Sequence, residues 1–339
     1  IKDHKEYFPT TRPSCWNRIY KNQLLKNEKF PENLKWEDYP FSLSNAIKSN
    51  NMPINQLVAF CNQNHNRPER CEDCPNEVCR GNCIACLEHI HRVGTNDRTY
   101  NCPNIIYCYT CNYIYKYSSE IEYLLNLYVE LLRNTQQIKM WSIGCGPCSE
   151  LFGLYNFKIR NNLNFDINYR GFDLNNTWTP IHNYIQQLPH FVSNFQYEDV
   201  FQYFQRNEES PNIVVLNYVL SDILRTNREY IDQFIDDLCN LINSLDKCLL
   251  IINDINLGRN NSEPRYYYNQ IRLKILRDSN IITQGSYHFV NSQSGYWRYG
   301  NQHANNIVST IPPNHIIQRY GAWTECRSAQ LLIFKRARI

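Results

Sequence analysis

The most constraining feature of this sequence is an apolar segment that runs directly into a glycine-rich turn, at residues 141–150. The turn carries two glycines one residue apart, Gly144 and Gly146, and a polar helix start follows them. A buried strand that turns sharply into a helix needs glycine there, because side chains would keep the backbone away from a ligand. The pattern therefore predicts a strand, a tight turn and a helix, in that order.

Four further apolar or aromatic segments follow, and each ends in polar residues. They are 169–173, 195–199, 212–218 and 248–254. Helical stretches separate these segments. A further helix is expected at 265–277, and a last strand is expected at 329–334. Alternating strands and helices predict a parallel sheet flanked by helices. An acid at the end of the second strand, here Asp173, can accept hydrogen bonds from ribose hydroxyls.

Three of these segments taken together resemble a class I S-adenosylmethionine-dependent methyltransferase: 142–147, 172–173 and 212–221. The resemblance covers residues 137–339 and implies an α/β, Rossmann-like, mostly parallel sheet. It also implies a cofactor site. Gly144 and Gly146 would line the methionine part, Asp173 would hold the ribose, and Cys145 and Leu174 would belong to the same cofactor site. Asp199 would lie near the adenine, and Asn217 would face the methyl group.

The sequence departs from the family pattern at two positions. The family usually has an acid two residues before the first glycine, where this chain has Ser142. The usual third glycine is here Cys148. The alternative is therefore a doubly wound domain that binds a different nucleotide or no ligand.

A cysteine-rich segment precedes this half of the chain. Nine of the 15 cysteines and three histidines lie in residues 61–111, and three cysteine pairs have the C-x-x-C spacing that lets two thiolates bind one tetrahedral metal. Twelve candidate ligands predict two or three zinc ions in an N-terminal zinc-binding module. The candidates are Cys61, His65, Cys71, Cys74, Cys79, Cys83, Cys86, His89, His91, Cys102, Cys108 and Cys111.

Other interpretations of this segment remain open. An iron–sulfur cluster would normally show a different cysteine spacing, and disulfides are disfavoured without secretion features. Five tyrosines between residues 107 and 117 offer stacking faces for nucleic-acid bases, but they equally fit a packed core. The charges of the segment nearly cancel, which favours the packed core.

The expected organisation has three parts: a helical and cysteine-rich module at 1–116, a connecting helix at 117–136 and the α/β domain at 137–339. A capping box formed by Ser119 and Glu122 is expected to begin the connecting helix. Pro53 is expected at the first position of an earlier helix.

The end of the fourth strand is where the resemblance places the chemistry, so Asn217 and Tyr218 are the catalytic candidates. Asn217 could orient the acceptor or only satisfy backbone groups at the strand end. Tyr296, Trp297 and Arg298 are the substrate candidates, because the segment 285–321 would overhang the strand ends. A packed hairpin is the alternative for these three.

The net charge of +3 among 339 residues gives no global basic field that demands a nucleic-acid partner. The sequence has no long apolar run, and its N-terminal residues are polar rather than signal-like. Both features argue against membrane association, and we expect a cytoplasmic protein. The expected function is methyl transfer from S-adenosylmethionine to a macromolecule, with RNA ahead of protein. The alternatives are a small-molecule methyltransferase, a binding or assembly protein, and a cofactor sensor.

Overall fold

The computed structural model describes residues 52–65, 82–91, 100–126, 132–207, 209–255, 264–278, 282–288, 308–326 and 328–336. Some of the expected site residues lie outside these ranges. They are the zinc candidates Cys71, Cys74 and Cys79 and the substrate candidates Tyr296, Trp297 and Arg298.

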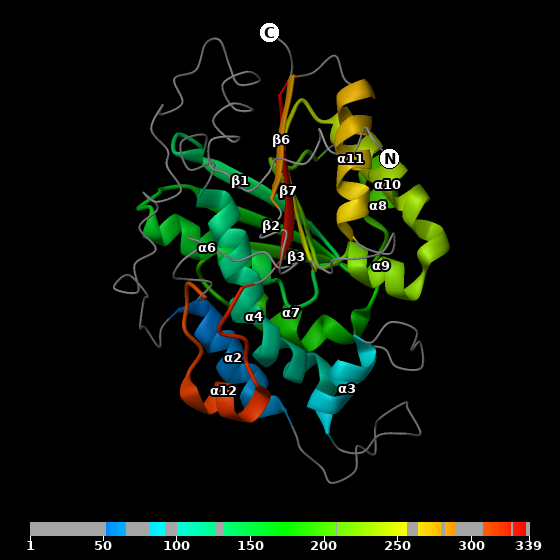
Figure 1. Ribbon diagram of the computed structural model, residues 1–339. Coiled ribbons are helices and arrows are strands. Elements are labelled where there is room, and N and C mark those ends of the chain that lie inside the picture. The colour runs from blue at the N-terminus through cyan, green and yellow to red at the C-terminus, as the bar shows by residue number, and fades with distance from the viewer. Residues whose placement is uncertain are drawn as a thin grey trace.

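A seven-stranded sheet with the order β3-β2-β1-β4-β5-β7-β6 forms the centre of the described structure (Figure 1). Strands β1 to β5 are parallel, and β7 runs antiparallel to both of its neighbours. The expected Rossmann-like, mostly parallel α/β fold is confirmed. The bounds are β1 Gln137–Ile143, β2 Asp166–Phe172, β3 Val192–Gln196, β4 Ile213–Asn217, β5 Lys247–Asp254, β6 Ile282–His288 and β7 Ala329–Arg336.

Helices cover both faces of the sheet (Figure 1). One face packs against α4 Pro103–Asn126, α6 Ser149–Arg160 and α7 Thr179–Gln186, while α2 Pro53–Asn64 and α12 Asn314–Tyr320 pack on α4 and share the same core. The other face packs against α8 Val200–Arg206, α9 Leu220–Thr226, α10 Ile231–Ser244 and α11 Pro264–Asp278. The short helix α3 Cys83–Ile90 packs on α4.

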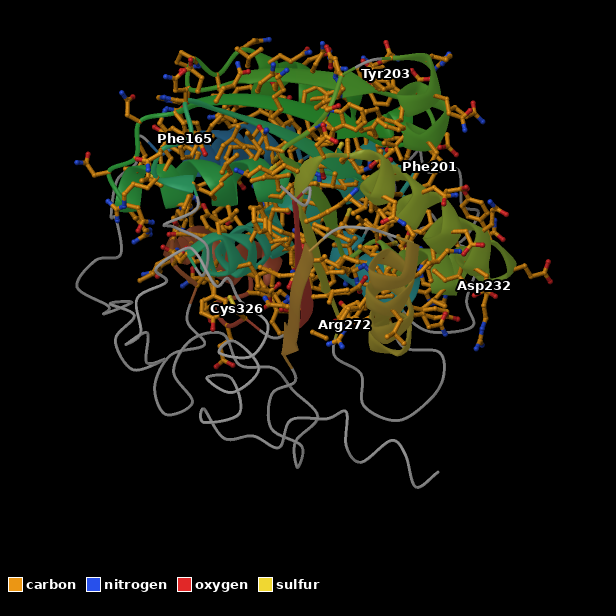
Figure 2. All side chains as sticks on the ribbon, turned by 90° about the horizontal axis from the view of Figure 1, so that it is seen from above. Phe165, Phe201, Tyr203, Asp232, Arg272 and Cys326 are labelled. Carbon is orange, nitrogen blue, oxygen red and sulfur yellow. The ribbon has the colours of Figure 1, made fainter. Side chains whose placement is uncertain are left out.

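Successive strand residues point to opposite faces and so divide into two cores. In β4, Ile213 and Val215 belong to the first core, whereas Val214 and Leu216 belong to the second. Both faces are covered, so the strand is apolar throughout rather than alternating. Figure 2 shows the side chains of both layers, with Phe165 in the first core and Phe201 in the second.

Helix α4 differs from the expectation. The predicted capping box at Ser119 and Glu122 is wrong, because the helix begins at Pro103 and Ser119 lies in its interior. The Ser119 hydroxyl donates to the carbonyl oxygen of Tyr115 at 2.6 Å, a back-bond to the preceding turn rather than a cap. The tyrosine-rich stretch before it is helical because it is packed: Tyr115 and Tyr117 are buried, as the packing interpretation predicted.

The same helix crosses residue 117, where the first two expected parts meet, and joins the N-terminal helices to the sheet. Gly153 of α6 allows this close approach, since a Cβ there would lie 2.6 Å from the Ser118 carbonyl oxygen. Residues of α2, α3, α4 and the sheet consequently share one core. Pro53 begins α2 as predicted. None of the described helices combines the length and apolar character that a membrane span requires.

Candidate functional site

The glycine turn lies where the sheet order changes direction, with β2 on one side of β1 and β4 on the other. Ligands of open α/β sheets bind at such a switch point, outside the carboxyl ends of the strands. Gly144 and Gly146 have φ values of +63° and +45°, which favour glycine. A Cβ on Gly144 would also lie 3.0 Å from a methyl group of Val219, so a side chain at this position would be crowded as well as strained.

Asp173 lies directly after β2 and is bonded to the turn. Its Oδ2 accepts the Gly146 N–H at 2.9 Å, and its Oδ1 accepts the Asn175 N–H at 2.9 Å. Burial raises the pKa of Asp173, while these two N–H groups lower it. Each carboxylate oxygen retains a further acceptor position. Two of the predicted cofactor residues are thus brought together, and the carboxylate is fixed in orientation.

Two other predicted cofactor residues lie at the same edge of the sheet. Leu174 is 79% exposed, which leaves a large apolar side chain next to the carboxylate of Asp173. Asp199 follows β3 and caps α8, because its Oδ1 accepts the Phe201 N–H at 2.7 Å. The edge therefore offers an acid, an exposed apolar side chain and a second acid on adjacent strand ends.

The two catalytic candidates lie at the end of β4. Asn217 donates from Nδ2 to the Ser149 hydroxyl at 2.9 Å and accepts from Asn253 Nδ2 at 2.8 Å. Both polar groups of its amide thus bond within the protein. Tyr218 follows with a φ of +63°, a left-handed conformation that is uncommon for a bulky residue. Such backbone positions cluster at functional sites.

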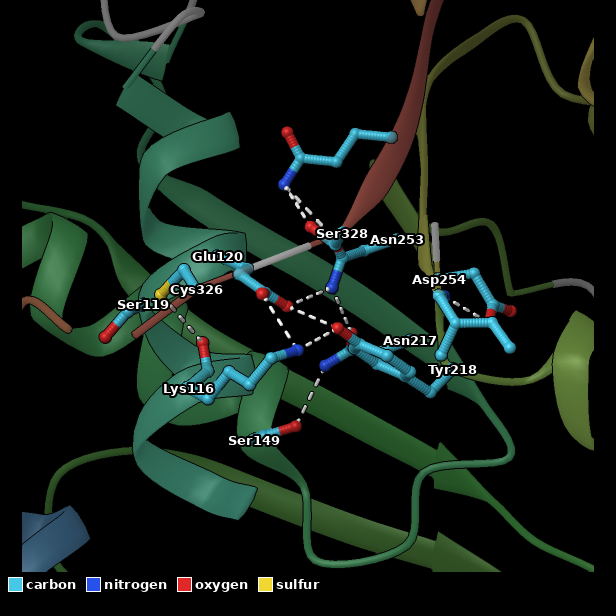
Figure 3. Close-up of polar contacts among 12 residues, drawn as sticks. Lys116, Ser119, Glu120, Ser149, Asn217, Tyr218, Asn253, Asp254, Cys326 and Ser328 are labelled. Carbon is cyan, nitrogen blue, oxygen red and sulfur yellow. Dashed lines mark hydrogen bonds and ion pairs between the residues drawn. The ribbon is translucent and has the colours of Figure 1, made fainter. Parts of the chain in front are cut away.

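A buried polar network from α4 meets Tyr218 at this point (Figure 3). The Tyr218 hydroxyl donates to Glu120 Oε2 at 3.0 Å and also contacts the Lys116 ammonium group. Glu120 pairs with Lys116 at 3.0 Å and accepts from Asn253 Nδ2 at 2.9 Å. Burial raises the pKa of Tyr218 well above its ordinary value, and the negative charge of Glu120 raises it further. Its hydroxyl is therefore protonated at neutral pH.

Sequence analysis missed Lys116, Glu120 and Asn253 as site residues. The signal for the first two was a pair of opposite charges four residues apart in an otherwise aromatic and apolar helix. Such a pair normally lies on a solvated face, but here Lys116 and Glu120 are both buried. Buried charges need partners, and these have each other and the strand-end polar groups.

An aromatic cluster borders the glycine turn on the α4 side. Trp178 lies near Gly146, and its ring centroid is 5.7 Å from that of Tyr109 and 6.2 Å from that of Tyr100. His91 bonds the hydroxyls of Tyr100 at 2.9 Å and Tyr113 at 3.2 Å. Both nitrogens of this imidazole are therefore engaged by tyrosine hydroxyls.

Nine of the twelve predicted zinc ligands belong to described residues. In that part of the chain no three of them bring ligand atoms within 4.8 Å of one another. Cys61 and Cys111 are neighbours in the core. Burial raises the pKa of the Cys111 thiol, and the nearby Cys61 thiol raises it further. The zinc assignment of this segment stays a prediction.

A different group of potential ligands lies directly beneath the glycine turn. Cys145, Cys148 and His182 are all buried, and their ligand atoms lie within 4.8 Å of one another. His182 Nε2 is 3.7 Å from Cys145 Sγ and 2.8 Å from the Gly146 carbonyl oxygen, to which it donates. Burial alone would raise the pKa of the Cys148 thiol, but the Cys145 thiol and His182 lower it to about 6. The predicted cofactor residue Cys145 thus points away from solvent into this group.

No family model and no curated protein matches the chain. Among solved structures, it is similar to the plantazolicin methyltransferase BpumL in complex with SAH, with a TM-score of 0.39 and 14% identity over 66% of this chain and 85% of that one. A putative class I S-adenosylmethionine-dependent methyltransferase from Listeria monocytogenes gives a TM-score of 0.39 and 9% identity over 67% of this chain and 63% of that one. The 16S rRNA methylase RmtB gives 0.33 and 11% over 63% and 62%. The similarities are low, and the fold assignment rests on strand order and register.

Proposed function

We propose that this protein binds S-adenosylmethionine at the carboxyl edge of β1, β2 and β4 and transfers its methyl group to an acceptor. The observation that carries the proposal is the bond between Gly146 N and Asp173 Oδ2 at the switch point of the sheet. It joins a turn whose two glycines have left-handed backbone conformations to a carboxylate with acceptor positions remaining. This is the combination that a nucleoside with an extended polar tail requires.

The residues present fit such a cofactor. Asp173 would accept from the ribose hydroxyls, and the exposed Leu174 would gain an apolar partner in the adenine ring. Gly144 and Gly146 would let the backbone approach the methionine part. Bound S-adenosylmethionine would supply a methyl group on a positively charged sulfur. Asp199 caps α8 and would lie at the adenine end of the site.

Tyr218 is the chain's own group for positioning the acceptor. Its hydroxyl donates to Glu120 and accepts from the Lys116 ammonium group, so the ring is fixed at the end of β4, where it would border the acceptor. An acceptor held in this way would present its lone pair along a fixed direction. Methyl transfer can proceed largely by such positioning. Asn217 would act indirectly, because it holds Ser149 and Asn253 rather than a ligand.

We further propose a macromolecular acceptor, with RNA ahead of protein. Tyr100, Tyr109 and Tyr113 are partly exposed in the cluster that contains Trp178 beside the glycine turn, and their rings would provide aromatic contacts for nucleic-acid bases. A zinc-binding segment at 61–111 would then be a folding element beside the acceptor, since metal binding supplies folding free energy.

A second candidate is a protein that binds the cofactor without turning it over. The side-chain amides of Asn217 and Asn253 favour this candidate, because they form hydrogen bonds within the protein rather than with a ligand. A small-molecule acceptor is a further alternative. The proposals separate in one assay: the full-length, zinc-replete protein is incubated with methyl-labelled S-adenosylmethionine and with total RNA, protein or metabolite fractions.

Label in the RNA fraction, lost with Tyr218→Phe, is the expected result. Label in the protein or metabolite fraction alone would overturn the RNA assignment. Cofactor binding with no label in any fraction would overturn the enzyme assignment in favour of the sensor. Tyr155→Phe is the matched control, because Tyr155 bonds His190 at 3.4 Å on another side of the fold.

A further inference from the structure

The group beneath the glycine turn has the composition of a metal site. Cys145 and Cys148 supply two thiols from the turn, and His182 supplies an imidazole from α7. Two thiolates and one imidazole suit zinc among the common cellular metals. From the usual Zn–S and Zn–N lengths, tetrahedral geometry separates a sulfur and a nitrogen ligand by about 3.6 Å. The observed separation of Cys145 Sγ and His182 Nε2 is 3.7 Å.

The surroundings support the same use. The other imidazole nitrogen, Nδ1, bonds the Tyr197 hydroxyl at 2.9 Å, and the ring stacks on Phe195 with centroids 4.0 Å apart. An imidazole that ligates a metal usually has such a partner on its second nitrogen. Metal binding would replace the bond that Nε2 donates to the Gly146 carbonyl oxygen, which also lies 3.7 Å from Cys148 Sγ.

Cys148 also occupies a position that costs free energy for any side chain. Its φ is +61°, at the N-cap of α6, where glycine is the residue without strain. Strain of this kind persists where the residue is needed for something other than the backbone. A thiol at this point reaches both Cys145 and His182, whereas a glycine there would leave the group with two ligands.

The burial of both cysteines argues against a redox sensor. Cys145 is 3% exposed and Cys148 is fully buried, whereas cysteines that respond to oxidants are accessible. Two thiolates also cancel the charge of one zinc ion, so the occupied group would be neutral in the core. Binding requires both cysteines as thiolates and Nε2 of the imidazole without its proton.

We propose that Cys145, Cys148 and His182 bind one zinc ion that fastens the glycine turn to α7. The site is separate from the predicted ligands at 61–111, and zinc binding here does not depend on methyl transfer. If the proposed function holds, the ion would also steady Asp173, because Gly146 lies between the ligands and donates its N–H to that carboxylate.

The test compares the zinc content of the full-length protein with that of single variants, by elemental analysis after dialysis against a weak chelator. Cys148→Gly is the key variant, because it removes a ligand while relieving the left-handed strain. We expect it to lose one equivalent of zinc, to be less stable than the parent with zinc and at least as stable after complete zinc removal. Cys239→Ala, at a buried cysteine of α10, is the matched control and should retain all zinc.

A second variant keeps the outcome clear. Tyr197→Phe removes the partner of Nδ1 without touching a ligand and should weaken zinc binding roughly 10-fold. Unchanged zinc content in both Cys148→Gly and His182→Ala would overturn the proposal. So would a Cys145–Cys148 disulfide in the protein purified without reductant, detected by mass spectrometry, in place of the missing ion. Both results can be read whether or not the protein binds S-adenosylmethionine.

Discussion

The Tyr218 hydroxyl donates to Glu120 Oε2 at 3.0 Å, and this bond ties the end of β4 to a helix nearly a hundred residues earlier in the chain. It places a protonated phenol at the strand end where methyl transfer is proposed. Lys116 lies 4.4 Å from the centroid of the same ring, so a cation also holds the tyrosine in place. The network is buried, which strengthens each of its interactions.

Removal of the Tyr218 hydroxyl tests this arrangement. Tyr218→Phe keeps the stacking on Tyr117, whose centroid is 3.9 Å away, but removes the hydroxyl that bonds Glu120 and Lys116 and so fixes the ring. We expect the rate of methyl transfer to fall about 100-fold, with little change in cofactor affinity. Single-turnover rates and calorimetric binding constants separate the two effects. An unchanged rate would exclude Tyr218 as a positioning residue.

The exposed Leu174 gives a prediction that separates binding from stability. Leu174→Ala should weaken S-adenosylmethionine binding by roughly 10-fold, because the adenine would lose apolar contact. The free energy of unfolding should change by less than about 0.5 kcal/mol, since the side chain is 79% exposed. Val192→Ala is the control, because Val192 is 68% exposed at the start of β3, away from the carboxyl ends of the strands. Equal binding by both variants would place the adenine elsewhere.

Gly153 tests the junction between the N-terminal helices and the sheet. Gly153→Ala would put a methyl group 2.6 Å from the Ser118 carbonyl oxygen, so α4 and α6 must move apart. Overpacking of this kind should lower the free energy of unfolding by about 1–3 kcal/mol, measured with urea. Ile159→Ala, at an exposed position of the same helix, should have a much smaller effect. Equal effects of the two substitutions would contradict the close approach.

Asp254 predicts a pH dependence of stability. Burial raises its pKa from 3.8 to about 6, against the N–H groups of Ser221 and Ile255 that lower it. The folded state therefore binds a proton that the unfolded state releases between those two values. This contribution to stability is fully present below the unfolded pKa and is lost as the pH rises through the folded pKa.

The pH effect amounts to about 3 kcal/mol, from roughly two pKa units at 1.36 kcal/mol each. Asp254→Asn removes it. Urea unfolding at several pH values should show the parent gaining that much relative to the variant between about pH 8 and pH 3.5. A constant difference between the two proteins at every pH would show that Asp254 keeps its ordinary pKa.

Most of the sheet follows from the sequence. The parallel strands are buried on both faces, so runs such as that of β4 stand out, and their polar ends mark the ligand edge. The turn at Gly144 and Gly146 was equally readable, because its left-handed backbone favours glycine. Strand β6 was not predicted. It is an edge strand with Thr283, Gln284, Gly285 and Ser286 in place of an apolar run.

The site was only half predictable. Asp173 was found because it follows a strand at a characteristic position. Glu120 was not, because its partners Tyr218 and Asn253 are 98 and 133 residues away and no local pattern encodes such contacts. His182 was missed for the same reason, since nothing near it in the sequence relates it to Cys145. The helical start at Ser119 failed because burial favoured helix through the tyrosine-rich stretch, against the local capping signal.

The most direct test of the central claim is calorimetric titration of the full-length, zinc-replete protein with S-adenosylmethionine and S-adenosylhomocysteine. We predict binding of both ligands, weakened roughly 10- to 100-fold by Asp173→Ala, which removes hydrogen bonds to a charged group. Asp166→Ala, at the exposed start of the same strand, should bind as the parent does. No heat with either ligand in a folded sample, or equal binding by the Asp173→Ala variant, would contradict the account.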